Sequence, residues 1–152
     1  MARQSAGLLP FRMRDGVLEV LLAHPGGPFW SRKDLGAWSV VKGEMEDGEE
    51  GLHAAVREFR EETGIEPGGP YISLGSVKQK GGKVVHVWIC EADIDADAVR
   101  SNEVRMEWPK GSGRVITFPE IDRCAWFGAA EARRRINPAQ AEMLERLESL
   151  RR

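Results

Sequence analysis

Three glutamates lie close together in the chain and have the chemistry of a cation site. They are Glu58, Glu61 and Glu62, within the run REFREE that starts at Arg57. On an α-helix, which turns by about 100° per residue, Glu61 would lie about 60° to one side of Glu58 and Glu62 about 40° to the other. Carboxylates held this closely repel one another, and a hard divalent cation, which prefers oxygen ligands, would offset that repulsion. A solvated acidic face paired with surface arginines is the alternative.

The residues around these acids have the pattern of one helix with marked ends. Asp47 is a candidate N-cap, and Glu50, three residues later, would complete a capping box. The positions expected to face the core recur at helical spacing, and they are Leu52, Ala55, Val56, Phe59 and Thr63. Gly64 would end the helix as its C′ glycine. We therefore expect the acids at the edge of this helix, beside the buried stripe.

The wider spacing resembles the Nudix box, G-x5-E-x7-R-E-U-x-E-E-x-G-U, in which U is a bulky aliphatic residue. The residues in register are Gly43, Glu49, Arg57, Glu58, Glu61, Glu62, Gly64 and Ile65. Such a set of fixed residue types matches by chance at roughly one in 10⁸ starting points. Phe59 stands where an aliphatic residue is usual, but its apolar ring still suits the buried stripe. The chain is therefore similar to Nudix hydrolases over the box from Gly43 to Ile65.

This resemblance implies an α/β fold, a Nudix-type α/β/α sandwich with a mixed β-sheet between helices, and the hydrophobic pattern agrees. The expected strands are Ser5–Phe11, Val17–His24, Ala37–Val41, Tyr71–Gln79, Lys83–Glu91, Val115–Phe118 and Cys124–Phe127. Further helices are expected over Ala129–Arg135 and Pro138–Leu150. The polar stretches Pro25–Gly36 and Asp93–Gly113 are expected to be loops.

The resemblance also implies a ligand set for the cation. Glu58 and Glu62 would be the principal metal ligands, and Glu61 would add charge and a further ligand. The backbone carbonyl of Lys42 would be another ligand, beside a glycine that lets the loop approach closely. The expected ion is Mg²⁺, which is held by a few carboxylates and keeps several waters, with Mn²⁺ as a substitute.

Other residues would support the metal or move protons. Arg57 would orient one carboxylate through a bidentate pair, and Glu49 would be a supporting ligand or a base. Glu120 is the best candidate for a general base from a separate loop, ahead of the weaker candidates Glu103 and Glu107. The choice of base between Glu58 and Glu120 stays open at this point.

Candidate substrate-binding residues lie in and around the loop before the box. Trp30 could stack on a nucleobase and Lys33 could bind phosphate, or the loop aromatics could simply cover the core. Trp38 and Lys42 stand in a segment that resembles the W-x-x-P-K-G loop of dinucleoside polyphosphate hydrolases, with valine in place of the proline. His86, on an alternating strand, could line a base pocket, although a packed strand histidine is the more common case.

These features predict a metal-dependent hydrolase of diphosphate linkages. A bound cation neutralises phosphate oxygens and lowers the pKa of a water, while positioning and electrostatics dominate phosphoryl transfer. The expected substrate is a nucleoside diphosphate linked to another group, and the best single choice is a dinucleoside polyphosphate such as diadenosine tetraphosphate. The alternatives are a nucleoside triphosphate pyrophosphatase, a nucleotide-sugar hydrolase or a non-catalytic nucleotide sensor.

The composition indicates one domain of mixed charge over residues 1–152. The net charge is −2, with 22 basic and 24 acidic residues, which does not favour binding to a nucleic-acid backbone. The apolar runs near the N-terminus are too short to span a bilayer, and no signal peptide is recognised. Cys90 and Cys124 match no metal spacing and are expected to be reduced thiols. We therefore expect a cytoplasmic protein, a monomer or homodimer, with a nucleotide substrate and no nucleic-acid or membrane partner.

Overall fold

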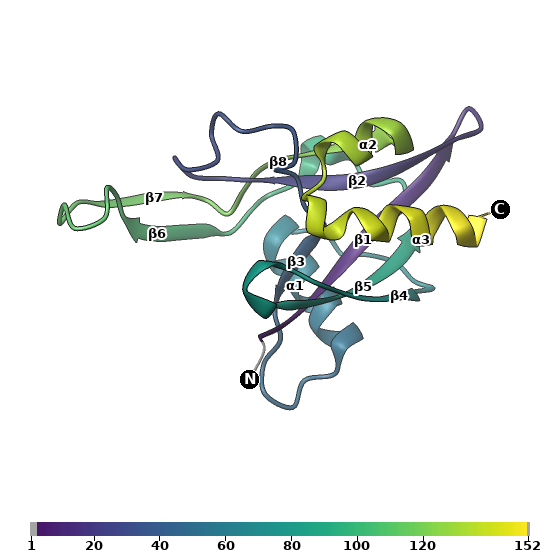
Figure 1. Cartoon of the computed structure of the whole chain (residues 1–152), viewed down its shortest axis with the longest axis horizontal. Helices are drawn as coiled ribbons and strands as arrows, with labels where there is room; N and C mark the ends of the chain where they lie inside the picture. Colours follow the sequence, from purple (N-terminus) through teal and green to yellow (C-terminus); the bar gives the residue numbers. More distant parts are fainter. Residues whose placement is uncertain (1–2, 152) are drawn as a thin grey trace.

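The structure, a computed structural model, describes residues 3–151 (Figure 1). Its strands are β1 (Gln4–Arg14), β2 (Val17–Pro25), β3 (Val41–Glu44), β4 (Ile72–Lys78), β5 (Val84–Glu91), β6 (Glu103–Glu107), β7 (Val115–Pro119) and β8 (Ile121–Gly128). Its α-helices are α1 (Gly51–Thr63), α2 (Ala129–Arg135) and α3 (Ala141–Arg151), and its 3₁₀ turns are η1 (Lys80–Gly82), η2 (Ala96–Ala98) and η3 (Pro138–Gln140). None of the helices in this range is long and apolar enough to cross a membrane.

The main sheet forks at one edge of its long strand β1. Its order is β4-β5-β1-β2-β8, with β1 parallel to β5 and the other pairs antiparallel. Along the same edge, residues 11–14 of β1 pair with β2, whereas residues 5–8 pair with β3. The sheet is therefore open between β2 and β3. Side chains from both faces of the sheet can enter this opening.

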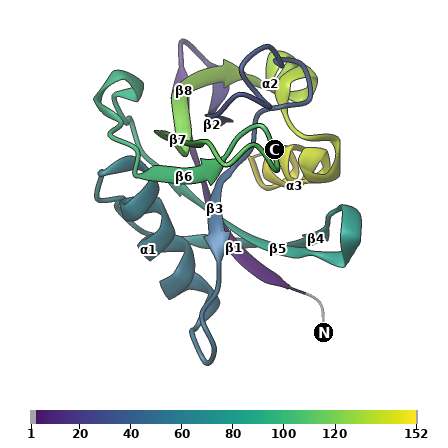
Figure 2. The ribbon, with the colours of Figure 1, turned by 90° about the vertical axis from the view of Figure 1, so that its left-hand side faces the viewer.

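Helices cover both faces of the sheet, as Figure 2 shows with α1 on one side and α2 and α3 on the other. Alternate residues of β1 divide between two cores because successive side chains of a strand point to opposite faces. Leu8 packs with Phe59 of α1, whereas Leu9 packs with Leu144 of α3. The predicted α/β fold with a mixed sheet between helices is confirmed.

The start of the acidic helix differs from the prediction. The helix begins at Gly51 with Glu50 as N-cap, and no side chain bonds to the cap. Asp47 instead belongs to a turn closed by Gly48, whose φ is +75°. Glu49 closes this turn and does not cap the helix, because its Oε1 accepts a hydrogen bond from the backbone N–H of Glu46 at 3.0 Å. The helix ends as predicted at Gly64, which has φ +72°.

Two other segment predictions were wrong. The expected strand Ala37–Val41 starts only at its last residue, and Trp38 and Ser39 form isolated bridges instead. They do so because the segment crosses the opening of the sheet, with the N–H of Trp38 bonded to Arg135 and that of Ser39 to Ala23.

The expected loop Asp93–Gly113 contains a strand. Its residues 103–107 form β6, which pairs with β7 in a separate hairpin that projects from the molecule (Figure 1). The Glu107 carboxylate closes the tip of this hairpin by accepting hydrogen bonds from the backbone N–H groups of Gly111 and Gly113. The hairpin matters to function because its base lies beside the site described next.

Candidate active site

The acidic cluster lies partly inside the protein and not at the edge of α1. Glu58 is 8% exposed and Glu62 is 5% exposed, whereas Glu61 faces solvent. Leu52 and Val56, expected in the buried stripe, are only half-buried. Glu58 and Glu62 are buried because the opening between β2 and β3 faces α1 and accepts their carboxylates.

The backbone of β3 makes room for the first of these carboxylates. A Cβ atom placed on Gly43 would lie 1.9 Å from Oε2 of Glu58 and 2.1 Å from its Cδ. No side chain can therefore share this position with Glu58 as it stands. Glycine at residue 43 lets the helix bring the carboxylate against the strand.

Arg57 connects the acids to one another. Its Nε and Nη2 donate to the two carboxylate oxygens of Glu49 at 2.8 and 2.9 Å, which is a bidentate pair. Its Nη1 donates to Glu58 at 2.9 Å and to Glu61 at 3.2 Å. A further bond runs from Nη2 to the backbone oxygen of Glu44 at 3.2 Å. Arg57 thus fixes the box helix to the end of β3.

The charges of the site are unevenly compensated. Hydrogen bonds from Arg57 lower the pKa of Glu49 to about 2. In contrast, burial and the nearby charge of Glu120 raise the pKa of Glu62 to about 8. Burial also raises the pKa of Glu58, against the opposing effect of Arg57. When Glu58 and Glu62 are ionised, they carry more negative charge than the surrounding protein neutralises.

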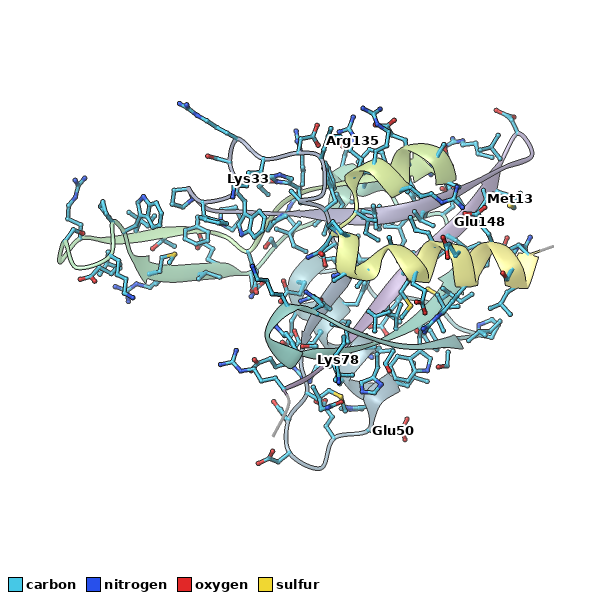
Figure 3. All side chains as sticks on the ribbon, viewed as in Figure 1. Met13, Lys33, Glu50, Lys78, Arg135 and Glu148 are labelled. Carbon is cyan, nitrogen blue, oxygen red and sulfur yellow. The ribbon has the colours of Figure 1, made fainter. Side chains whose placement is uncertain are left out.

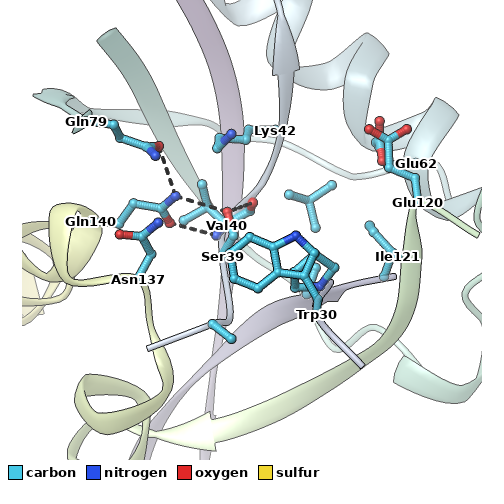
Figure 4. Close-up of a pocket in the computed structure, with 14 residues that line it drawn as sticks. Trp30, Ser39, Val40, Lys42, Glu62, Gln79, Glu120, Ile121, Asn137 and Gln140 are labelled. Atoms are coloured by element: carbon cyan, nitrogen blue, oxygen red, sulfur yellow. Dashed lines mark hydrogen bonds between the residues drawn. The ribbon is translucent and has the colours of Figure 1, made fainter. Parts of the chain in front are cut away.

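Two of these acids, Glu62 and Glu120, lie at one end of a cavity of about 230 Å³ (Figure 4). Lys42 projects into the cavity from β3. Burial, with the neighbouring charge of Lys83, lowers the pKa of Lys42 to about 8. Trp30 borders the same space. A cavity with acids at one end and a cation within it suits an anion that is bound through a metal ion.

Carboxamide side chains line the cavity on the side opposite Glu62 and Glu120, and the sequence did not predict them. They are Gln79, from the turn after β4, and Asn137 and Gln140, from the η3 turn between α2 and α3 (Figure 4). Gln140 is buried and holds the cavity wall, because it accepts from the backbone N–H of Val40 at 3.0 Å and donates to Gln79 at 3.2 Å. The only sequence signal was the Asn-Pro step before the last helix, which is typical of a helix start.

Glu120 lies where three segments meet. Its backbone N–H donates to Asn102 at 2.9 Å, just before β6, and its backbone oxygen accepts from Gly26 at 2.9 Å. Its carboxylate accepts from the side chain of Asn102 at 2.8 Å. The side chain remains exposed and lines the cavity beside Glu62. Glu103 and Glu107 lie on the projecting hairpin and do not line this cavity.

The structure does not bring every expected binding residue to the cavity. Trp38 is 2% exposed and packs edge-on against His24 and Phe127, so it is a core residue and its predicted contact with substrate is withdrawn. His86 bonds to Gln4 at 2.6 Å and lies outside the cavity lining, so that assignment is withdrawn as well.

Lys33 takes a different place from the one expected. It is exposed on the loop after β2, where Figure 3 labels it, and its ammonium lies 3.8 Å from the centroid of the Phe29 ring. The backbone oxygen of Lys33 is bonded to Nε2 of the buried His24 at 2.6 Å, while Nδ1 of His24 faces Asp122 at 2.9 Å. His24 thereby anchors the loop that carries Trp30.

The acidic residues fit a hard divalent cation by their chemistry, although they do not form a finished ligand set. Within residues 3–151, no three acidic, histidine or cysteine side chains converge closely enough to hold one ion. Arg57 holds oxygens of Glu58 and Glu61 that such an ion would need. The buried, undercompensated charge of Glu58 and Glu62 is what a cation would neutralise, and oxygen ligands suit Mg²⁺ or Mn²⁺.

The family model of the NUDIX domain matches residues 1–147 of this chain. The chain belongs to the Nudix family. Proteins of the Nudix family generally use divalent metal ions, in agreement with the acidic cluster. The predicted enzyme class, a Nudix pyrophosphohydrolase, is confirmed.

Solved Nudix structures resemble this chain over nearly its whole length. The NUDIX domain of Shewanella oneidensis NrtR, complexed with ADP ribose, is 16% identical with a TM-score of 0.69, covering 100% of this chain and 90% of that one. A C. elegans Ap4A hydrolase in a binary complex is 20% identical with a TM-score of 0.67, covering 96% of each chain. The E. coli ORF135 protein is 25% identical with a TM-score of 0.58, covering 99% and 92%. The first two likenesses show the Nudix fold.

Proposed function

We propose that this Nudix protein uses Mg²⁺, or Mn²⁺ in its place, to hydrolyse a dinucleoside polyphosphate such as diadenosine tetraphosphate. The observation that carries the proposal is the buried carboxylate of Glu62 at one end of a cavity that also contains Lys42, with the buried carboxylate of Glu58 one helical turn away on α1. A buried acidic pair attracts a cation, and a cation together with a lysine can bind a diphosphate.

In this proposal Glu58 and Glu62 are the principal ligands, with Glu61 and the backbone oxygen of Lys42 as further ligands. When bound, the divalent cation would neutralise charge on the diphosphate and lower the pKa of a water. Arg57, paired with Glu49, holds α1 to the end of β3 and so keeps the carboxylates of α1 in position. The ammonium of Lys42, which projects into the cavity, binds a phosphate oxygen.

Glu120 is the better placed general base. Its carboxylate is exposed at the cavity beside Glu62, where a water can reach it. The carboxylate of Glu58, in contrast, lies between Arg57 and Gly43. A base must come within hydrogen-bond reach of the water that it deprotonates, and Glu120 meets that requirement more directly.

Two features support a dinucleoside polyphosphate as the substrate. The Trp38–Gly43 segment resembles the loop of dinucleoside polyphosphate hydrolases, and the similar C. elegans structure is named as an Ap4A hydrolase. The cavity itself, with Trp30 and the carboxamides of Gln79 and Asn137, offers stacking and hydrogen-bonding groups to one nucleobase. A substrate with two nucleobases would extend beyond this cavity.

The test is product analysis with purified protein. Diadenosine tetraphosphate, nucleoside triphosphates and nucleotide sugars are incubated with Mg²⁺ in ¹⁸O-water, and the products are identified by mass. We expect the highest kcat/KM for the dinucleotide and no turnover with chelator. Preference for triphosphates or nucleotide sugars would replace the substrate assignment, and inertness toward all of them would indicate a nucleotide sensor.

A further inference from the structure

A second pocket, of about 320 Å³, lies between the loop after β2 and the β6–β7 hairpin, along which it extends from Phe118 near the base to Trp108 near the tip. Its wall is almost entirely apolar and aromatic, and the side chains that form it are Pro28, Phe29, Trp30, Met106, Trp108 and Phe118. Ligand pockets in proteins begin at about this size and are lined mainly by apolar and aromatic groups. The pocket could therefore hold one flat ring system.

Large apolar side chains remain exposed around this pocket. Phe29 is 55% exposed, Met106 40% and Trp108 36%. Lys33 places its ammonium 3.8 Å from the Phe29 ring centroid, so the rim also carries a positive charge. Aromatic faces beside a cation favour a ligand that combines a planar ring with phosphate.

The pocket is held open by close packing of the loop against the hairpin. A Cβ atom on Gly26 would lie 1.9 Å from the backbone oxygen of Pro119, and one on Gly27 would lie 2.7 Å from the ring of Phe118. Gly26 also bonds through its N–H to the backbone oxygen of Glu120. These contacts fix the loop on β7, so the pocket does not depend on a bound ligand to keep its shape.

The pocket adjoins the candidate active site. Trp30 lines both the apolar pocket and the acid-lined cavity. Phe118 in the apolar pocket and Glu120 in the cavity are separated by a single residue of the chain. A polyphosphate that lies across Glu62 and Glu120 would therefore carry its far end past Trp30 toward Phe118.

We propose that the apolar pocket binds the second nucleobase of a dinucleoside polyphosphate, with Trp108 and Phe29 as stacking surfaces. The proposal rests on the proposed function, because it assigns the half of that substrate that the acid-lined cavity does not hold. A single-base nucleotide leaves this pocket without a partner. The pocket thus selects for substrates with an aromatic group on both ends of the phosphate chain.

The test compares Trp108→Ala with two matched variants. Trp108→Phe keeps an aromatic face, and Val115→Ala removes an exposed side chain of the same hairpin that does not line the pocket. KM is measured for diadenosine tetraphosphate, and ATP is measured as a competing ligand. Since stacking on one aromatic residue changes base affinity by about 5-fold or more, Trp108→Ala should raise KM for the dinucleotide at least about 5-fold. ATP affinity should stay within about 2-fold, as should both constants in Val115→Ala. Trp108→Phe should raise KM for the dinucleotide less than Trp108→Ala does.

Several results would overturn this assignment. Equal losses for the dinucleotide and ATP would indicate a general distortion, and an unchanged KM would show that the pocket is not used. Sedimentation that finds a dimer in the wild type and a monomer in Trp108→Ala would show that a second copy of the chain occupies the pocket. A wild type that leaves the dinucleotide intact would remove the proposed function itself, whereas cleavage with an unchanged KM in Trp108→Ala removes only the pocket assignment.

Discussion

The carboxylate of Glu58 lies directly against the α-carbon of Gly43, so that a methyl group on residue 43 would come within 1.9 Å of Oε2. This contact joins the first residue of the Nudix box to Glu58. The spacing of the box therefore reflects a packing requirement as well as the proposed set of ligands.

Gly43→Ala should reduce turnover by about 100-fold, because a shift of about 1 Å in a catalytic group can have an effect of that size. The added methyl meets the end of a side chain and not backbone, so the fold should survive and Tm should change little. Steady-state kinetics and thermal unfolding measure the two effects. Gly68→Ala is the control, because a Cβ at residue 68 meets nothing within 4 Å. Equal turnover in Gly43→Ala and Gly68→Ala would contradict the contact between residue 43 and Glu58.

Arg57→Lys should lower metal affinity and activity by about 10- to 100-fold, as is usual when a group that orients metal ligands is changed. Lysine keeps the charge but cannot form the bidentate pair with Glu49. The measurements are kcat/KM and Mn²⁺ affinity. Arg60→Lys, in the same helix but paired with the exposed Glu66, should stay within about 2-fold. A similar loss in both variants would assign the effect to helix stability.

The raised pKa of Glu62 predicts a pH dependence of stability in the metal-free protein. Its pKa of about 8 in the folded chain lies above the value of about 4.3 expected when unfolded. The folded state therefore binds the proton more tightly, and stability is lost as the pH rises through this range. The Tm of Glu62→Gln minus that of the wild type should increase from about pH 5 to about pH 8 and then level off.

Glu145→Gln is the control for this pH series, because Glu145 is exposed on α3. Its Tm difference from the wild type should not vary with pH. Added Mg²⁺ should stabilise the wild type more at about pH 8 than at about pH 6, since metal ligands must be deprotonated. A constant Tm difference for Glu62→Gln would show that Glu62 is already ionised at low pH.

Lys42 should set an alkaline limit to activity. Its pKa is lowered to about 8, so the free enzyme loses this phosphate-binding charge above about pH 8 and kcat/KM should fall there. Lys42→Arg should remove the fall, because arginine stays charged beyond about pH 12. Lys83→Met should move the fall to higher pH, since Lys83 helps to lower the pKa of Lys42. An alkaline fall that is identical in all three proteins would exclude Lys42 as its cause.

The helix of the box was predictable because its signals are local. Periodic apolar residues and a terminal glycine define α1, and its C-terminal end at Gly64 is where the pattern placed it. Its start was misplaced because Glu49 serves Arg57 and the turn at Glu46, not the helix end. A tertiary contact overrode the capping preference of Asp47, and capping patterns contain no information on such contacts.

The remaining differences depend on contacts between distant parts of the chain. The carboxamides of Gln79 and Gln140 meet across 61 residues, and no local pattern predicts this. Trp38, expected on a strand and in contact with substrate, is buried because the segment crosses the opening of the sheet and its ring packs on Phe127. The strand β6 alternates polar and apolar residues, but it is only five residues long and mostly exposed, and the polar stretch around it is typical of a loop, whereas its partner β7 was predicted.

Mn²⁺ binding to the wild type and to Glu62→Gln, followed by electron paramagnetic resonance, tests the central claim most directly. If the buried carboxylates of Glu58 and Glu62 hold the catalytic cation, the substitution should weaken Mn²⁺ binding by at least about 10-fold and abolish cleavage of diadenosine tetraphosphate in the same samples. Wild-type Mn²⁺ affinity together with undiminished cleavage in Glu62→Gln would contradict the account.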